Sequence, residues 1–170
     1  MRSLKLVEHN PKWISDYEIE AGKLRQMLSG IVISTYHIGS TAIAGIKAKP
    51  VIDILVEVSC LDDLETMHDQ FRKIGYEPKG DYGIKGRRFY QKGGDERTHH
   101  VHIYKTGNSE IKRHRLFVSF MKEHPDKAAE YEALKMALSI QYKDSSDSYS
   151  RGKSEFIKSV DDEAAKSKNS

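Results

Sequence analysis

Residues 37–56 read HIGSTAIAGIKAKPVIDILV and join two apolar runs through a turn of small residues. The second run, 51–58, is typical of a buried strand, yet Asp53 lies in its middle. Because strand side chains alternate between faces, one face is entirely apolar and the other carries two carboxylates. The apolar face consists of Ile52, Ile54, Val56 and Val58, and the other of Val51, Asp53, Leu55 and Glu57. We therefore expect the second face to be partly wet or occupied by a cation.

A carboxylate in such a strand needs a partner, because an uncompensated buried charge costs several kcal/mol. One interpretation of Asp53 is a salt bridge to a nearby lysine or arginine. The other is a metal ion held by Asp53 and further ligands. The alternation pattern leaves both interpretations open.

The rest of the chain mixes helical and strand patterns. Residues 11–29 repeat apolar side chains at helical spacing, with Asn10 as a candidate N-cap and Pro11 at the first helical position. Further expected elements are a strand over 31–38, a helix over 61–74 that Gly75 ends, hairpin strands over 87–92 and 97–104 around GGDE, a helix over 109–123 capped by Ser109, a helix from Pro125 to about 138, and a last helix around 153–160. The polar segment KDSSDSYS should separate the last two helices, and the final ten residues should fray. This order predicts an α+β fold with a mixed sheet flanked by helices.

Composition bounds the class of protein. The 170 residues suit a single domain, here expected over 1–170 with a helical C-terminal part at about 109–165. A net charge of +3 is too mild to indicate nucleic-acid binding, but it fits an anionic small ligand. Cys60 is the single cysteine, so no internal disulfide can form, and no apolar stretch approaches the length of a membrane span. We expect a cytoplasmic protein with no membrane partner.

The turn at Gly39-Ser40 has two interpretations. It could simply connect two strands, or its serine hydroxyl and backbone N–H groups could hold a phosphate oxygen. The spacing matches neither GxxxxGK[ST] nor GxGxxG.

The segment HIGSTAIAGIKAKPVIDILV closely resembles the signature of the GrpB-like (UPF0157) family, which belongs by fold to the nucleotidyltransferase superfamily. Other family-like blocks follow in the same order across nearly the whole chain: Pro11-Lys12-Trp13, GRRFYQKGG at 86–94, HHVHIY at 99–104, FMKEHPDKAAEYEALKMAL at 120–138 and YSRGKSEFI at 149–157. The resemblance implies a nucleotidyltransferase-like mixed sheet, with C-terminal helices closing a cleft. It also implies a phosphate-holding Gly-Ser turn and carboxylates that hold Mg²⁺ against a nucleoside triphosphate.

This sequence matches the site residues that the resemblance implies only in part. Gly39 and Ser40, with Thr41, match the turn, and Asp53 matches the first carboxylate, the expected catalytic residue. The second carboxylate should fall at position 55, where this chain has leucine. Glu57 is on the same face but roughly 6 to 7 Å further along the strand. The candidate strand for the third carboxylate offers histidines instead.

Those histidines suggest a different metal site. His100 and His102 should share a strand face, since Val101 and Ile103 occupy the other. If the two strands are neighbours, Asp53, His100 and His102 could bind Zn²⁺, Mn²⁺ or Fe²⁺, with His37 as an extra ligand. Alternatively, the histidines hydrogen-bond the backbone or a phosphate, or line a wet cleft.

Basic residues supply candidate phosphate ligands, although most surface cations are merely solvated. Lys49 follows the turn, whereas Arg88 and Lys153 fall inside family-like blocks, so these three are the predicted contacts. Because Arg87 and Arg88 alternate along a strand, only one of them can face a given side. Tyr149 could stack on a base or simply pack.

The resulting prediction is a metal-dependent nucleotidyltransferase acting on a small-molecule acceptor, with Mg²⁺ or Mn²⁺, or else Zn²⁺, as cofactor. The alternative is a catalytically degenerate module that binds a nucleotide or another phosphorylated small molecule, coenzyme A-related ligands included. A protein-binding role without a small ligand is a third hypothesis. The sequence specifies neither the acceptor, nor the metal, nor the oligomeric state.

Overall fold

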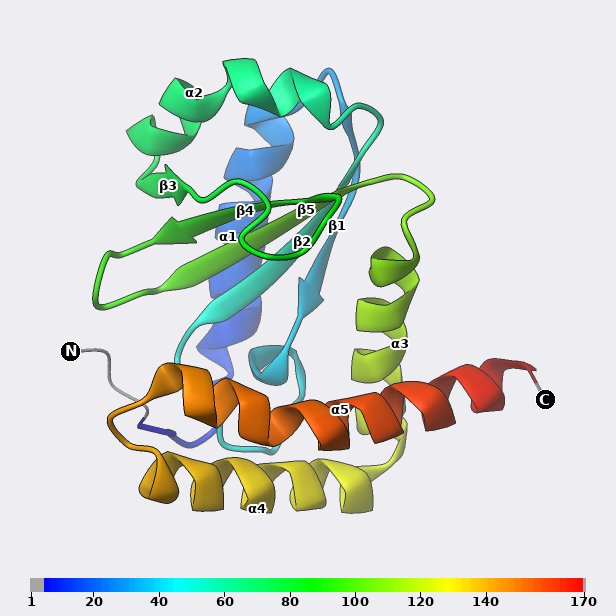
Figure 1. Cartoon of the computed structure of the whole chain (residues 1–170). Coiled ribbons are helices and arrows are strands. Elements are labelled where there is room, and N and C mark those ends of the chain that lie inside the picture. Colours follow the sequence, from blue (N-terminus) through cyan, green and yellow to red (C-terminus); the bar gives the residue numbers. More distant parts are fainter. Residues whose placement is uncertain (1–4, 170) are drawn as a thin grey trace.

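The computed structural model, which describes residues 5–169, is built on a five-stranded mixed sheet with strand order β1-β2-β5-β4-β3 (Figure 1). The parallel pair β2 and β5 lies inside the sheet, and all other neighbouring strands are antiparallel. The strands are β1 (Val32–Ile38), β2 (Ile52–Val58), β3 (Tyr76–Pro78), β4 (Arg87–Lys92) and β5 (His99–Lys105). The predicted α+β class with a mixed sheet is confirmed.

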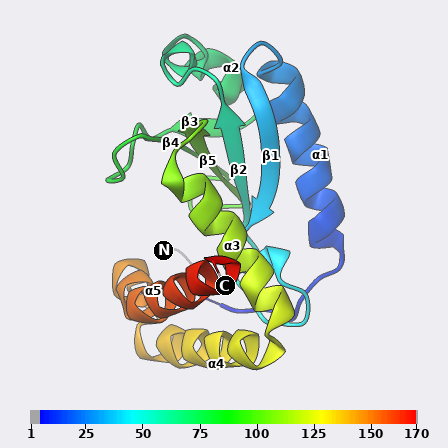
Figure 2. The same ribbon diagram turned by 90° about the vertical axis from the view of Figure 1, so that its right-hand side faces the viewer.

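Helices cover both faces of this sheet. They are α1 (Lys12–Met27), α2 (His68–Lys73), α3 (Ser109–Glu123), α4 (Pro125–Gln141) and α5 (Ser146–Asn169), with short 3-10 turns η1 (Ser40–Ala42) and η2 (Asp62–Thr66). Figure 2 shows α1 and α3 on opposite sides of β1 and β2. In both views α4 and α5 lie side by side beyond one end of the sheet. In residues 5–169 no helix is both long enough and apolar enough to cross a membrane.

Strand β2 contributes to two separate cores. Its apolar face packs with α1 and α2 in the first core, as the alternation predicts. The opposite face is drier than expected: Leu55 is fully buried in the second core, together with Phe117 and Met121 of α3. The other members of that face, Val51, Asp53 and Glu57, keep partial exposure. The face is therefore partly wet, as expected, except at Leu55, which α3 covers in the middle of the strand.

Two local predictions fail, and one strand was not predicted. Asn108, not Ser109, caps α3, because its side chain accepts a hydrogen bond from the Glu110 backbone N–H. The helix expected over 61–74 is split into η2 and α2. β3 is a further strand, which no sequence pattern indicated.

The C-terminal helix is longer than its sequence suggests. It begins at Ser146, inside the polar segment expected to be a linker, and continues through the residues expected to fray. The hydroxyl of Ser145 accepts a hydrogen bond from the backbone N–H of Ser148, which caps the first turn. Burial of Tyr149, Val160 and Ala164 then holds this helix to its neighbours along its length.

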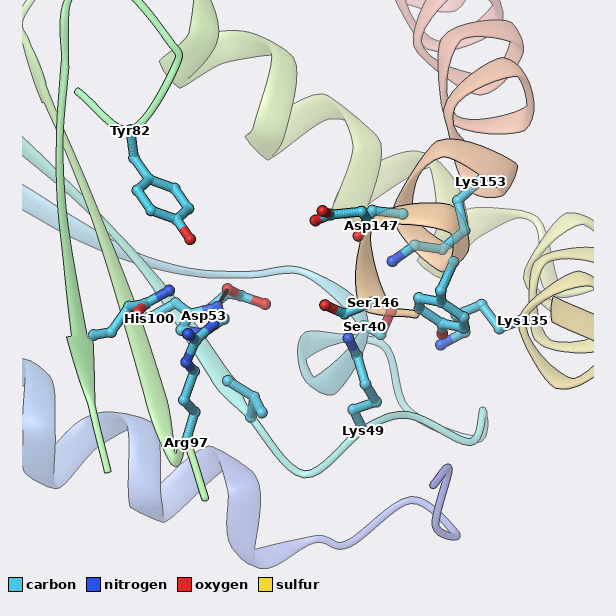
Figure 3. Close-up of a pocket in the computed structure, with 14 residues that line it drawn as sticks. Ser40, Lys49, Asp53, Tyr82, Arg97, His100, Lys135, Ser146, Asp147 and Lys153 are labelled. Carbon is cyan, nitrogen blue, oxygen red and sulfur yellow. Dashed lines mark ion pairs between the residues drawn. The ribbon is translucent and has the colours of Figure 1, made fainter. Parts of the chain in front are cut away.

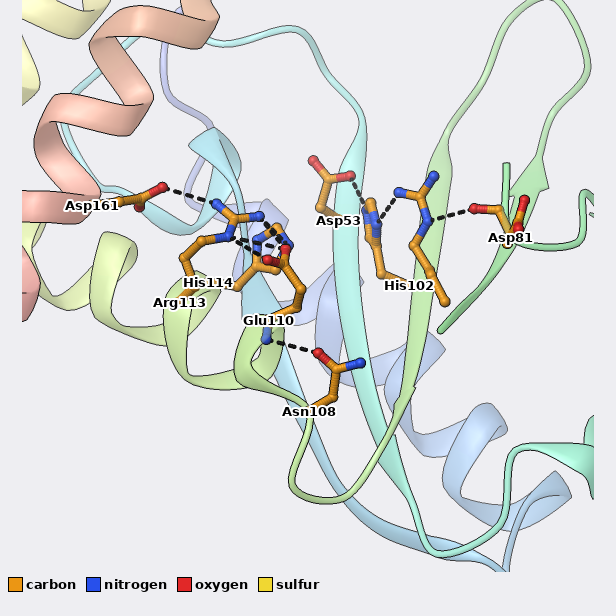
Figure 4. A network of polar contacts seen from close by, with 9 residues as sticks. Asp53, Asp81, His102, Asn108, Glu110, Arg113, His114 and Asp161 are labelled. Carbon is orange, nitrogen blue, oxygen red and sulfur yellow. Dashed lines mark hydrogen bonds and ion pairs between the residues drawn. The ribbon is translucent and has the colours of Figure 1, made fainter. Parts of the chain in front are cut away.

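Ion pairs join the late helices to one another. The Arg113 guanidinium of α3 donates to Glu110 in its own helix and to Asp161 of α5, at 2.6 and 3.1 Å (Figure 4). Lys127 of α4 lies 3.7 Å from Glu163 of α5. These pairs join the C-terminal half of α5 to α3 and α4.

Candidate functional site

The site is centred on a carboxylate and two histidines from adjacent parallel strands. The register of β2 and β5 pairs Asp53 with His100 and Leu55 with His102. Oδ1 of Asp53 lies 3.1 Å from Nε2 of His102 and 3.5 Å from Nδ1 of His100 (Figure 4 shows the His102 contact). Both histidines share the face of Asp53, while Val101 and Ile103 point into the first core, as the alternation predicts.

Burial and hydrogen bonding set the protonation of this group. Burial raises the pKa of Asp53, but the hydrogen bonds and charges of His100 and His102 outweigh it and hold that pKa well below its ordinary value. Burial lowers the pKa of His102, and the neighbouring Arg87 acts in the same direction. Nδ1 of His102 lies 3.4 Å from the Arg87 guanidinium, so Nδ1 accepts and Nε2–H donates to Asp53. The carboxylate therefore stays ionised and accepts the Nε2–H of His102.

The three side chains are not arranged as metal ligands. Both histidines point a ring nitrogen at Oδ1 of Asp53, and the described part of the chain contains no group of three or more His, Cys, Asp or Glu that could hold a metal ion. The metal site stays a prediction. His37 does not add to it, because its register with Ile54 places it on the α1 face, where its ring stacks on Tyr17 with centroids 4.8 Å apart.

The Gly39-Ser40 turn lies directly against Asp53. Gly39 has φ of 75°, and a Cβ added there would lie 2.6 Å from Oδ2 of Asp53. Both the backbone conformation and the close approach demand glycine. Ser40 then begins η1 and lines the neighbouring cavity. Thr41 is turned the other way: it is buried, and its hydroxyl bonds to Nε2 of His37 at 2.9 Å.

A cavity of about 320 Å³ lies between the sheet and the last two helices (Figure 3). This agrees with the expectation that C-terminal helices close a cleft. From the sheet side it is lined by Asp53, Gln91, Arg97 and His100, and from the helix side by Lys135, Ser146, Asp147, Tyr149, Ser150 and Lys153. Ser40, Lys49 and Val51 of the β1–β2 connection and Tyr82 of the β3–β4 connection complete the lining.

Three lysines gather on the helix side of the cavity. Nζ of Lys49 and Nζ of Lys153 each lie 4.7 Å from the ring centroid of Tyr149, which is fully buried. Lys135 is buried beside them, and its Nζ donates to the backbone carbonyl of Lys47 at 2.8 Å. Burial, reinforced by the charges of Lys153 and Lys49, lowers the pKa of Lys135 to about 7. The lysines therefore create a positive wall opposite Asp53.

Arg88 lies on the wrong face of the sheet to reach this cavity. Its Nε donates to Glu65 at 2.7 Å, and its register partner is Ile103 of the first core. Arg87 takes the site face instead, bonded to His102 and to the backbone carbonyls of Asp81 and Tyr82. It thereby anchors the loop that carries Tyr82 to the cavity. The alternation predicted that one arginine faces each side, and the choice of Arg88 does not agree with the register.

Several lining residues were not selected from the sequence. Gln91, Arg97, Ser146 and Asp147 carry no recognisable motif. Lys135 did carry a signal, because it lies in the apolar helix row of Tyr131 and Leu138, where a lysine must be buried or functional.

The chain as a whole matches a protein family and several known proteins. The family model described as "GrpB protein" matches residues 3–163. UPF0157 protein YqkA of Bacillus subtilis is 42% identical over 163 residues, which are 96% of this chain and 48% of that protein. This chain therefore spans about half the length of that relative. The crystal structure of conserved protein GrpB from Enterococcus faecalis superposes with a TM-score of 0.93 at 40% identity, covering 98% of this chain and all of that one.

A more distant likeness concerns the fold alone. The structure of Cid1 in complex with its short product ApU matches with a TM-score of 0.51 at 13% identity, covering 78% of this chain and 42% of that one. The two chains therefore share a fold over the superposed part.

Proposed function

Because the chain belongs to the GrpB family and shares a nucleotidyltransferase fold, we propose that its cavity binds a nucleotide or another phosphorylated small molecule. The observation that carries this proposal is the cluster of Lys49, Lys135 and Lys153 around the buried Tyr149. Lysine ammonium groups bind phosphate as point charges, and they do so more strongly where water is partly excluded.

The surroundings of the lysines favour an anion further. Helix α5 begins at Ser146, which lines the cavity, so the positive end of its dipole adds to the field of the lysines. Arg97 adds a fourth cation, whereas the lining contains only two carboxylates, Asp53 and Asp147. The net charge of the lining is therefore positive.

The lysine cluster and Asp53 lie on opposite sides of the cavity, and this orients the ligand, although Arg97 lies on the side of Asp53 and Asp147 on the side of the lysines. The ionised Asp53 repels phosphate, while the lysine cluster attracts it. Phosphate groups therefore bind toward Lys49 and Lys153, with Ser40 beside them. A sugar hydroxyl or another hydrogen-bond donor of the ligand faces Asp53. Thr41 and Arg88 take no part in this arrangement, since both bond to partners away from the cavity.

A thermal-shift panel tests the proposal. The panel contains ATP, GTP, CTP, UTP, coenzyme A and inorganic pyrophosphate, with unphosphorylated nucleosides as the matched control. Phosphorylated compounds should raise the melting temperature and nucleosides should not. If no phosphorylated compound shifts the melting temperature at millimolar concentration, the proposal is wrong.

Nucleotidyl transfer is the second candidate function, favoured by the contact between the Gly39 turn and Asp53. In that reaction an acceptor hydroxyl attacks the α-phosphate and pyrophosphate leaves. The fully buried Leu55 stands where the superfamily has its second carboxylate, so simple binding has the stronger support. The assay is pyrophosphate release with Mg²⁺, Mn²⁺ or Zn²⁺ across a panel of alcohols and phosphorylated acceptors. Turnover should be abolished in Asp53→Asn, and turnover that persists there would remove Asp53 from the mechanism.

A further inference from the structure

A second hollow adjoins the cavity at the outer edge of the sheet. It measures about 420 Å³ and is lined by residues of β3, β4 and the turn between β4 and β5, among them Glu77, Lys79 and Asp95. Two residues, Gln91 and Arg97, line both hollows. The two spaces therefore meet at these side chains.

The strand register explains why the two hollows lie next to each other. Glu77 of β3 pairs with Gln91 of β4, Gln91 pairs with His100 of β5, and His100 pairs with Asp53 of β2. Directly paired residues share one face of a sheet. A polar row thus runs across the sheet from the outer hollow to the centre of the cavity.

At the junction, polar groups lack partners within the protein. Nε2 of His100 is buried and has no hydrogen-bond partner among residues 5–169. Gln91 is only 6% exposed, and its side-chain amide makes no hydrogen bond within the described part of the chain. The Arg97 guanidinium likewise has no ion pair with any residue of 5–169. Since buried polar groups are nearly always paired, Nε2 of His100 and the amide of Gln91 indicate that a ligand meets this junction, where the half-buried Arg97 is also in reach.

We propose that the outer hollow is a subsite for a second anionic group of the phosphorylated ligand, which therefore carries two separated anions. This inference rests on the proposed function. Arg97 holds the second phosphate or carboxylate through its planar fork of donors, assisted by Lys79. Gln91 donates and accepts hydrogen bonds at the linking part of the ligand. His100 accepts a hydroxyl or amine hydrogen at Nε2, because its Nδ1 faces Asp53.

The experiment compares AMP with adenosine 3′,5′-bisphosphate, which adds one anionic group to the same nucleoside. Isothermal titration should show the bisphosphate binding about tenfold tighter than AMP. The variants Arg97→Gln and Lys79→Ala should bring this ratio close to one. Lys153→Ala should weaken both ligands by a similar factor, and the exposed Lys105→Ala, outside both linings, is the control for net charge.

The outcomes separate the two proposals. Equal affinities for AMP and the bisphosphate in the unmodified protein would overturn the subsite while leaving phosphate binding intact. A ratio that survives in both Arg97→Gln and Lys79→Ala would also overturn it. If neither compound binds at millimolar concentration, both proposals fail together.

Discussion

Gly39 and Asp53 are in direct contact: a Cβ added to Gly39 would lie 2.6 Å from Oδ2 of the carboxylate. The turn after β1 and the carboxylate in β2 are therefore one structural unit. The carboxylate is clamped between the glycine backbone on one side and His100 and His102 on the other. Its position depends on all three contacts.

This contact predicts that Gly39→Ala destabilises the protein more than its backbone conformation alone would require. Gly45 is the matched control, because it has φ of 87° but no atom within 4 Å of an added Cβ. Gly45→Ala should cost about 1 to 2 kcal/mol in the free energy of unfolding, and Gly39→Ala roughly 3 kcal/mol or more. Urea unfolding measures the free energy of unfolding of both variants. If the two variants lose the same amount, the contact between Gly39 and Asp53 does not affect stability.

A buried ion pair predicts a second stability effect. Glu20 of α1 is 3% exposed and accepts hydrogen bonds from Nζ of Lys92 at 2.8 Å and from the Tyr76 hydroxyl at 3.0 Å. At neutral pH, Glu20→Gln should lower the free energy of unfolding by about 3 kcal/mol. Glu18→Gln, on the exposed surface 3.8 Å from Arg25, should change it by less than about 0.5 kcal/mol.

The same ion pair between Glu20 and Lys92 makes the stability of the protein depend on pH. Burial raises the pKa of Glu20, but Lys92 and the other partners hold it below the ordinary value of 4.5. Its stabilisation is therefore present above pH 4.5 and is lost as the pH falls through the lower folded-state pKa. The unmodified protein and Glu20→Gln should therefore differ less in their free energy of unfolding as the pH falls below 4.5. If this difference in the free energy of unfolding is the same at neutral pH and in acid, the ion pair does not stabilise the protein in the way proposed.

The buried Lys135 predicts that the stability of the protein rises with pH in the alkaline range. Its pKa is about 7 in the folded protein against 10.5 in an ordinary lysine, so between these values the unfolded chain binds the extra proton. Stability from this group therefore rises with pH across that range. Relative to Lys135→Met, the unmodified protein should gain stability between those pH values, as followed by urea unfolding. Lys143 is exposed, so the free energy of unfolding of Lys143→Met should differ from that of the unmodified protein by the same amount at every pH in this range. If Lys135→Met behaves in this way too, the lowered pKa of Lys135 is wrong.

Ligand binding should also be coupled to the proton on Lys135. A phosphate beside Lys49 and Lys153 raises the pKa of Lys135 by favouring its charged form. Above the free value of about 7, binding of pyrophosphate should therefore take up a proton. Calorimetry in two buffers of different ionisation enthalpy reports this uptake, which Lys135→Met should remove. If Lys135→Met still takes up a proton when pyrophosphate binds, the proton goes to a group other than Lys135.

The sequence predicts local patterns better than it predicts which patterns meet. Alternation correctly assigned Asp53, His100 and His102 to one face of their strands, and that face is shared because β2 and β5 are parallel neighbours. Alternation could not reveal that α3 would cover Leu55, since helix docking is a tertiary property. It also could not decide between Arg87 and Arg88, because the face of β4 depends on its register with β5.

The helix side of the cavity was even less accessible to sequence reasoning. Its cations come from segments far apart in the chain, and they meet only after α4 and α5 pack beyond the end of the sheet. The beginning of α5 was missed because serines and aspartates read as a linker, although a serine hydroxyl caps this helix. Lys153 was selected from the family resemblance, and the structure brings it to the same cavity as Lys49.

The most direct test of phosphate binding compares two cations on opposite faces of the sheet. Lys153 lines the cavity, whereas Arg88 bonds to Glu65 on the α2 face. Isothermal titration with ATP and inorganic pyrophosphate should show a loss of about tenfold or more in affinity for Lys153→Ala, and a change of less than about twofold for Arg88→Ala. Retained affinity in Lys153→Ala, or a large loss in Arg88→Ala, would contradict the placement of the phosphate at the lysine cluster.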